Sequence, residues 1–171
     1  MILRPKAFAL VLALAALSGG AAAAAHAPAI PVASLSDLSV PDHPYDENAD
    51  ANAAVEAAFE RAKLTHKRVM LDLGGNWCGD CRVLAGIMEL PAMKHYLAAH
   101  YELVSVDVGR FNKNLQVPAR FGFTERLVGV PTVLVANTDG SLVNKNDVFA
   151  LADARHMTPQ AIADWLAQWA D

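Results

Sequence analysis

The chain has 171 residues, a hydrophobic fraction of 54% and a formal net charge of −4. That length is typical of one domain, and the apolar fraction is sufficient for a buried core. The acidic balance disfavours nucleic acid as a partner, because phosphates need basic side chains to neutralise them. It also provides no polybasic surface for anionic lipid.

Residues 1–25 have the pattern of a secretory signal peptide. Arg4 and Lys6 form a short basic region, and an apolar run follows them. This run is too short to span a bilayer comfortably, and the small residues at its end suit a signal peptidase. We therefore expect an exported, periplasmic protein with a cleaved leader. In the alternative, the segment stays attached as an uncleaved membrane anchor.

The first predicted elements alternate between helix and strand. Residues 26–47 contain four prolines among small and polar residues, which predicts an extended linker before a domain over residues 48–171. Apolar residues at helical spacing predict a helix over residues 48–64. The apolar segment Arg68–Leu73 (RVMLDL) predicts a buried strand.

Further helices and strands follow in the second half. A helix is predicted from the WCGDC segment to about Leu90, and a second short helix from Pro91, a residue that suits the first helical turn, to His100. Alternating valines predict a strand over Tyr101–Val108. Residues 110–127 show no clear period, and they either influence the choice of partner or are an ordinary insertion.

The C-terminal part predicts a hairpin and a last helix. Strands are expected at Thr132–Ala136 and Ser141–Lys145, joined by the turn pair Asp139–Gly140. Thr158, followed by proline, predicts the start of the final helix. This order of elements predicts an α/β fold with a mixed central sheet of about four to five strands flanked by helices. The connection between the first two strands contains helices, so these strands are expected to be parallel.

Cys78 and Cys81 are the two cysteines of the chain, and they form one C-x-x-C motif. A pair confined to one motif is placed for chemistry or metal binding rather than for stapling the fold. At the start of a helix, free N–H groups and the positive end of the helix dipole favour the thiolate of the first cysteine. We expect Cys78 to attack a disulfide and Cys81 to resolve the mixed disulfide that forms.

A zinc site is the alternative for this motif. His95 and His100 follow the cysteines at a spacing that fits a Cys2His2 site on count alone. A buried strand precedes the motif, however, and an independent core surrounds it, so that folding needs no metal. We expect no metal, and no cofactor either, because the electrons of the exchange reside in the cysteine pair.

The segment Val69–Cys81 (VMLDLGGNWCGDC) resembles the active-site strand and turn of thioredoxin-family proteins. Val130–Thr132 (VPT) resembles the cis-proline segment of that family. The stretch from Leu90 to Asp107 is similar to the exported thioredoxin-like group that includes the C-terminal domain of the transmembrane disulfide reductase. The resemblance covers nearly all of the chain after the linker, and it implies a thioredoxin fold.

The resemblance implies roles for four further residues. Asp72 takes the place of a buried acid, where burial would raise its pKa and allow it to accept the proton of the resolving thiol; the alternative is a hydrated residue at a strand end. Trp77 would shield the disulfide or be an ordinary core residue. A cis peptide bond at Pro131 would leave the backbone of Val130 free to pair with an extended substrate, whereas a proline at the start of an edge strand is the alternative.

The predicted function is dithiol–disulfide exchange, with a protein disulfide as substrate and a protein as electron donor. A carboxylate at Asp80, between the cysteines, disfavours the thiolate and suits a reductase. Arg82 either offsets this charge or is a solvated helix residue. An oxidase or isomerase of exported proteins and a binding module without catalysis are the alternatives. Retention of both cysteines, with Asp72 before them, counts against the binding module.

Overall fold

The computed structural model describes residues 26–170, so the predicted signal peptide lies outside the described residues. At the centre of this part, strand β1 (Arg68–Gly74) pairs in parallel with β2 (Tyr101–Asp107) and antiparallel with β3 (Thr132–Ala136). The predicted α/β class with a mixed sheet is confirmed. No helix in this part of the chain is both long enough and apolar enough to cross a membrane.

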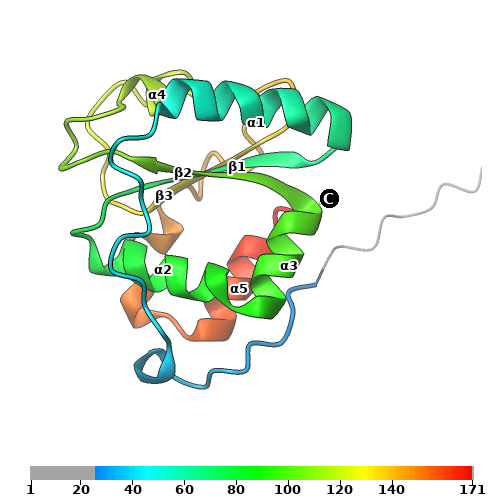
Figure 1. Ribbon diagram of the computed structural model, residues 1–171, viewed down its shortest axis with the longest axis vertical. Coiled ribbons are helices and arrows are strands. Elements are labelled where there is room, and N and C mark those ends of the chain that lie inside the picture. Colours follow the sequence, from blue (N-terminus) through cyan, green and yellow to red (C-terminus); the bar gives the residue numbers. More distant parts are fainter. Residues whose placement is uncertain (1–25, 171) are drawn as a thin grey trace, which may run out of the picture.

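Helices cover both faces of the sheet (Figure 1). Helix α1 lies on one face, and α2, α3 and α5 lie on the other. The helical elements are η1 (Leu35–Asp37), α1 (Ala51–Thr65), α2 (Gly79–Glu89), α3 (Pro91–His100), α4 (Gln116–Ala119), η2 (Ala150–His156) and α5 (Pro159–Ala167). The boundaries follow the capping residues: Asp50 accepts a hydrogen bond from the N–H of Ala53, and Thr158 accepts one from that of Ala161.

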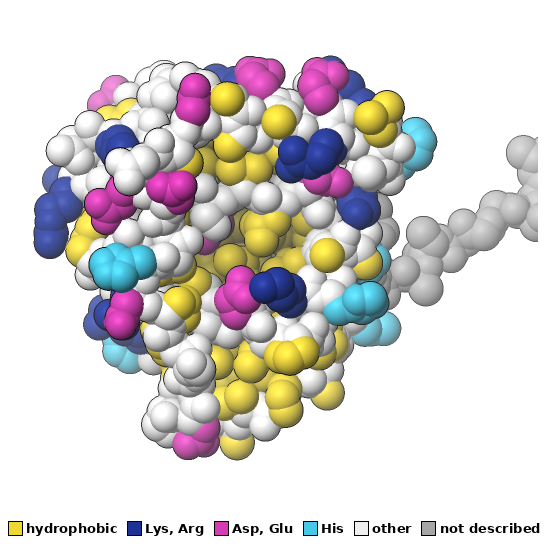
Figure 2. Space-filling view, viewed as in Figure 1, with side chains coloured by type: hydrophobic (Ala, Val, Ile, Leu, Met, Phe, Trp, Pro, Cys, Tyr) yellow, Lys and Arg dark blue, Asp and Glu magenta, His cyan; other side chains and the backbone are white. Residues whose placement is uncertain are grey.

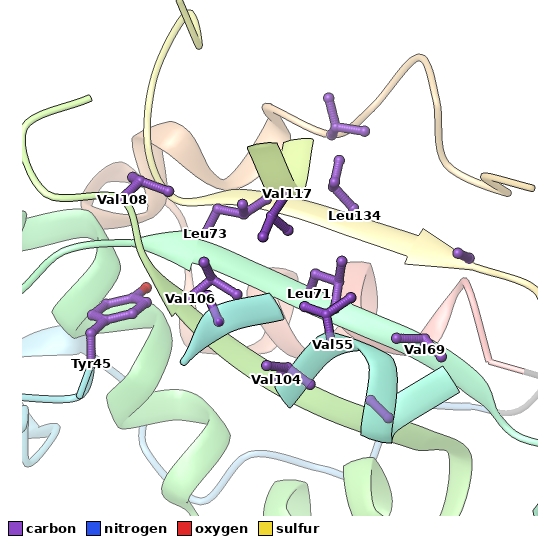
Figure 3. Close-up of a cluster of buried hydrophobic side chains, with 14 of the residues drawn as sticks. Tyr45, Val55, Val69, Leu71, Leu73, Val104, Val106, Val108, Val117 and Leu134 are labelled. Carbon is purple, nitrogen blue, oxygen red and sulfur yellow. The ribbon is translucent and has the colours of Figure 1, made fainter. Parts of the chain in front are cut away.

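Strand β1 is buried on both faces, and its alternating side chains divide the core. Val69, Leu71 and Leu73 belong to the hydrophobic cluster beneath α1, whereas Met70 belongs to the cluster against α2 and α5. Figure 3 shows Val55 of α1 lying over this strand. Asp72 shares the parity of Met70, so it faces the side of the sheet on which the cysteine-bearing helix packs.

The predicted fourth strand at Ser141–Lys145 is reduced to an isolated antiparallel bridge between Ala136 and Leu142. At this edge of the sheet, the side chain of Asn144 bonds to two backbone groups of β3. Its Oδ1 accepts a hydrogen bond from the N–H of Val135 at 2.9 Å, and its Nδ2 donates to the carbonyl of Val133 at 2.8 Å. The backbone still bonds from Val143 N–H to the carbonyl of Val135 and from Asn137 N–H to that of Ser141, so the side chain of Asn144 replaces only part of a strand ladder. The sheet keeps three strands among the described residues.

The segment 26–47 contains the short helix η1 and is otherwise without regular secondary structure, and it packs onto the domain as an arm. It runs past α2 and the sheet to the start of α1 (Figure 1). Leu38 and Tyr45 are buried, each in one of the two hydrophobic clusters. The backbone of Ser39 lies so close to Gly86 of α2 that a Cβ at residue 86 would stand 2.9 Å from its carbonyl oxygen. The arm is thus part of the folded domain.

Candidate active site

The cysteine pair lies where β1 leads into α2. Cys78 is the N-cap residue of α2, and its Sγ accepts a hydrogen bond from the N–H of Cys81 at 3.2 Å. The two cysteines form a disulfide with their Cα atoms 5.3 Å apart. The sulfur of Cys78 therefore sits at the positive end of the helix, where a negative charge is stabilised.

Cys78 is the member of the pair that reaches the surface. Its exposed fraction is 5%, whereas Cys81 is fully buried. The carbonyl oxygen of Val130 lies 3.3 Å from Sγ of Cys78, and the peptide bond between Val130 and Pro131 is cis. Pro131 also immediately precedes the edge strand β3, so both sequence interpretations of this proline describe part of its setting.

Asp72 lies in the middle of the central strand with an exposed fraction of 1%. Burial raises its pKa from the ordinary 3.8 to about 7, because a charged carboxylate is poorly solvated there. The hydroxyl of Tyr45 donates a hydrogen bond to Oδ2 at 2.9 Å, which acts in the opposite direction. Oδ1 has no hydrogen-bond partner among the described residues. One carboxylate oxygen is therefore occupied and the other is available.

Gly74 lies next to both the Tyr45 hydroxyl, which binds Asp72, and the sulfur of Cys81. A Cβ at residue 74 would stand 2.9 Å from Sγ of Cys81 and 2.5 Å from Cζ of Tyr45, and closer still to the tyrosine hydroxyl. Real side chains do not tolerate such contacts. A glycine here thus lets the hydroxyl and the sulfur approach the same end of β1.

Trp77 is a surface residue, with 44% of its side chain exposed, so its interpretation as an ordinary core residue is wrong. Its Nε1 donates a hydrogen bond to the carbonyl of Gly109 at 2.7 Å. The guanidinium of Arg110 lies 4.8 Å from the centre of the indole, and the ring of Phe111 contacts it edge-on at 6.0 Å. Three consecutive residues, 109–111, therefore hold the ring of Trp77, the residue that precedes Cys78.

Asp80 is buried, and its charge is compensated by a residue from η2. The backbone N–H of Arg155 donates to Oδ1 at 2.9 Å, and Nε of the same residue lies 3.1 Å from Oδ2. Arg82, the cation considered from the sequence, instead binds Asp42 and the carbonyl of Pro41. The effect of Asp80 on the neighbouring thiolate is therefore smaller than the sequence alone predicts.

The zinc alternative finds no geometric support. His95 and His100 lie on α3, and His100 contacts the ring of Tyr96. Within residues 26–170, no group of three or more His, Cys, Asp and Glu side chains is arranged to hold a metal ion. The two cysteines are joined to each other.

A large cavity lies away from the cysteines. It has a volume of about 730 Å³, and Figure 2 shows a hollow of this kind with hydrophobic side chains on its floor. The arm, α2, α3 and β2 line it, and neither cysteine nor Asp72 is among its lining residues. Trp77 and Val130 are not among its lining residues either.

Two residues of this site were missed by sequence reasoning. Tyr45 lies in a proline-rich segment that shows no pattern of strand or helix, and Arg155 lies 75 residues after Asp80. Neither has a local motif, because each contact depends on how distant parts of the chain pack. One sequence signal did point towards a partner: the apolar flanks of Asp72 predict a buried carboxyl group, and such a group needs a hydrogen-bond donor.

Comparisons with known proteins agree with this geometry. A family model described as thioredoxin-like matches residues 50–137, slightly more than half of the chain. A thioredoxin from Alicyclobacillus acidocaldarius subsp. acidocaldarius is 28% identical over 80 residues, which are 47% of this chain and 68% of that protein. The crystal structure of a disulphide isomerase from Xylella fastidiosa Temecula1 is 39% identical, with a TM-score of 0.69, over 74% of this chain and 95% of that one. The chain therefore belongs to the thioredoxin-like family, and its cysteine pair makes it a thiol–disulfide oxidoreductase of that family.

Proposed function

We propose that the protein is exported to the periplasm and reduces disulfides of other proteins there. The observation that carries the chemistry is the pairing of a helix-capping Cys78 with a buried Cys81 and a buried Asp72 on the same side of β1. A module that only binds peptides needs neither two cysteines nor a buried acid. Export rests on the basic, apolar and small-residue pattern of residues 1–25.

The reaction proceeds in two transfers. The thiolate of Cys78 attacks one sulfur of the substrate disulfide, forming a mixed disulfide and releasing the other substrate sulfur as a thiolate that takes up a proton. Asp72 then accepts the proton of the Cys81 thiol, and the Cys81 sulfur attacks Sγ of Cys78. This second attack forms the Cys78–Cys81 disulfide and releases the second substrate sulfur as a thiolate, which takes up a proton. Two electrons pass from the cysteine pair to the substrate.

The backbone of Val130 and the ring of Trp77 hold the substrate beside Cys78. The carbonyl of Val130 lies at the sulfur, so an extended peptide pairing with this residue would place its own sulfur close to Cys78. The exposed ring of Trp77 offers an apolar surface on the other side. A donor protein with a dithiol must reduce the Cys78–Cys81 disulfide again after each turnover.

The acidic surroundings of the pair support the reductase direction. Asp72 and Asp80 are both buried near the cysteines, and negative charge disfavours the thiolate on which a strongly oxidising pair depends. Arg155 offsets the charge of Asp80, so Asp72 supplies the larger part of this effect. An isomerase is the second candidate, because the Xylella fastidiosa protein of known structure is described as a disulphide isomerase.

Trapping of the mixed disulfide tests the exchange. Reduced Cys81→Ser protein is mixed with a disulfide-containing protein such as insulin. It should accumulate a complex joined by a disulfide at Cys78, and dithiothreitol should separate the two proteins by reducing that bond. Cys78→Ser is the matched control and should form none, because Cys81 is buried. If Cys81→Ser forms no complex either, the exchange function is wrong.

The reduction potential tests the direction. Residues 26–171 are equilibrated in glutathione or dithiothreitol buffers, with the fluorescence of Trp77 as the signal. A potential of about −270 mV supports a reductase, and about −180 mV supports an isomerase. A potential of about −120 mV identifies an oxidant and contradicts the proposed direction.

A further inference from the structure

We infer that Tyr45, on the arm that precedes the family-matched region, is a positioning residue for Asp72: its hydroxyl occupies Oδ2 and leaves Oδ1 to receive the proton of Cys81. The hydrogen bond itself is a property of the fold, whereas its consequence for exchange rests on the proposed function. The family model begins at residue 50, so this contribution comes from a part of the chain that the model does not cover.

The contact between the two side chains is sealed from solvent. Tyr45 and Asp72 are both buried, and Oη of the tyrosine lies 2.9 Å from Oδ2. Oδ1 is equally buried and has no partner among the described residues. An unpaired carboxylate oxygen is unfavourable in such a place, and a donor that reaches it at another stage of the reaction would explain why it is kept. The Cys81 thiol, which appears when the disulfide is reduced, is a donor on the same side of the sheet.

The arm is attached to the active-site turn independently of this hydroxyl. The N–H of Tyr45 donates to Oδ1 of Asn76 at 2.9 Å, and Nδ2 of Asn76 donates to the carbonyl of Tyr45 at 3.0 Å. Asn76 also donates to the carboxylate of Glu47 at 2.9 Å. Because Asn76 lies two residues before Cys78, these bonds fix the position of the tyrosine relative to the cysteine pair.

The charges around Tyr45 keep its proton in place. Burial, the neighbouring Asp72 and the more distant Asp107 all raise the pKa of Tyr45 well above its ordinary value. Asp107 is the last residue of β2 and pairs with Gly74 in the sheet. Nζ of Lys113 lies 2.8 Å from its carboxylate. Tyr45 therefore remains a hydrogen-bond donor throughout the pH range in which Asp72 titrates.

A permanent donor at Oδ2 stabilises the charged form of Asp72. The hydrogen bond lowers the pKa of this carboxyl and so opposes the larger effect of burial, which brings it to about 7. Loss of the hydroxyl would raise the pKa further, and less carboxylate would be present at neutral pH. Since only the carboxylate can accept the proton of Cys81, the exchange reaction would then need a higher pH.

The test is Tyr45→Phe, which removes the hydroxyl and keeps the ring and both backbone bonds to Asn76. In oxidised protein, the ¹³C resonance of the Asp72 carboxyl, assigned with Asp72→Asn, should titrate about one pH unit higher than in the unmodified chain. The pH profile of single-turnover oxidation of the reduced protein by a peptide disulfide should move in the same direction. Tyr101→Phe is the matched control: it removes a buried hydroxyl that donates to the carbonyl of Leu166 at 2.7 Å, and it should move neither curve.

A second variant protects the test from a folding defect. Asn76→Ala loosens the arm without touching either side chain of the pair, and it should move both curves in the same direction by a smaller amount. An unchanged or lowered Asp72 titration in Tyr45→Phe, or in Asn76→Ala if Tyr45→Phe does not fold, overturns the inference. If the unmodified chain shows no exchange while the Asp72 titration still moves, the proposed function fails and the positioning of Asp72 stands.

Discussion

Arg155 binds the buried carboxylate of Asp80 twice, through its backbone N–H at 2.9 Å and through Nε of its side chain at 3.1 Å. This contact joins η2 to the first turn of α2, between the two cysteines of the motif. The side chain of Arg155 also lies against Gly79, where a Cβ would stand 3.1 Å from its Cδ. A distant cation thus compensates the one acidic residue inside the C-x-x-C motif.

Removal of this cation should decrease the reactivity of Cys78. In Arg155→Met, the backbone bond to Asp80 remains but the compensating charge is lost, so the carboxylate disfavours the neighbouring thiolate more strongly. We expect reduced Arg155→Met protein to be alkylated by iodoacetamide several-fold more slowly than the unmodified chain at neutral pH. Arg82→Met is the control, because Arg82 binds Asp42 rather than Asp80. Equal alkylation rates in all three proteins would contradict the role of Arg155.

Asp72 should destabilise the oxidised protein in a pH-dependent way. Its pKa is about 7 in the folded state and near 3.8 in the unfolded chain, so the unfolded state gives up this proton first as the pH rises. The destabilisation of the folded state by Asp72 is absent below about pH 4, grows between pH 4 and 7, and is constant above that range. Relative to the unmodified chain, Asp72→Asn should gain up to about 4 kcal/mol in free energy of unfolding over this interval. Urea denaturation at a series of pH values measures the difference, and a gap independent of pH would refute it.

Gly74→Ala should disturb both Tyr45 and Cys81. The added methyl group would overlap the tyrosine hydroxyl and stand 2.9 Å from Sγ of Cys81, so side chains must shift. We expect a loss of about 1–3 kcal/mol in the free energy of unfolding. Combining it with Tyr45→Ala should give a smaller loss than the sum of the two single changes, because the ring no longer fills the space. Strict additivity in this double-mutant cycle would show that the two residues do not compete for one position.

The parts of the fold that follow from local patterns could be predicted from the sequence. The mostly apolar segment Arg68–Leu73 forms nearly all of the buried central strand, and Thr158 caps the final helix as its side chain predicts. The cysteines lie at the start of α2 because a strand, two glycines and a helical pattern follow one another there. Such features are determined by periodicity and capping within a few residues.

The parts that depend on packing between distant segments could not be predicted. The arm contributes Tyr45 across 27 residues to Asp72, and η2 contributes Arg155 across 75 residues to Asp80. The position of Trp77 depends on the carbonyl of Gly109 and on Arg110, which lie just before and at the start of the segment that showed no pattern. In each case the sequence pointed to the functional residue but not to its partner. A buried polar group requires a hydrogen-bond partner of a suitable chemical type, but that partner can lie anywhere in the sequence.

Asn144 should be essential for the edge of the sheet, where it occupies the place of a fourth strand. Its side chain accepts a hydrogen bond from the N–H of Val135 and donates one to the carbonyl of Val133, and all three residues are buried. Asn144→Leu leaves both backbone groups without a partner and should lower the free energy of unfolding by about 2–4 kcal/mol. Asn144→Asp still accepts from Val135 but cannot donate to Val133, whose carbonyl it then faces with a carboxylate oxygen, so it should also be destabilising. Asn137→Ala, which removes an exposed contact with Ser141, is the control and should change stability by about 0.5 kcal/mol or less in urea denaturation. If Asn144→Leu is no less stable than this control, the side chain does not replace the missing strand.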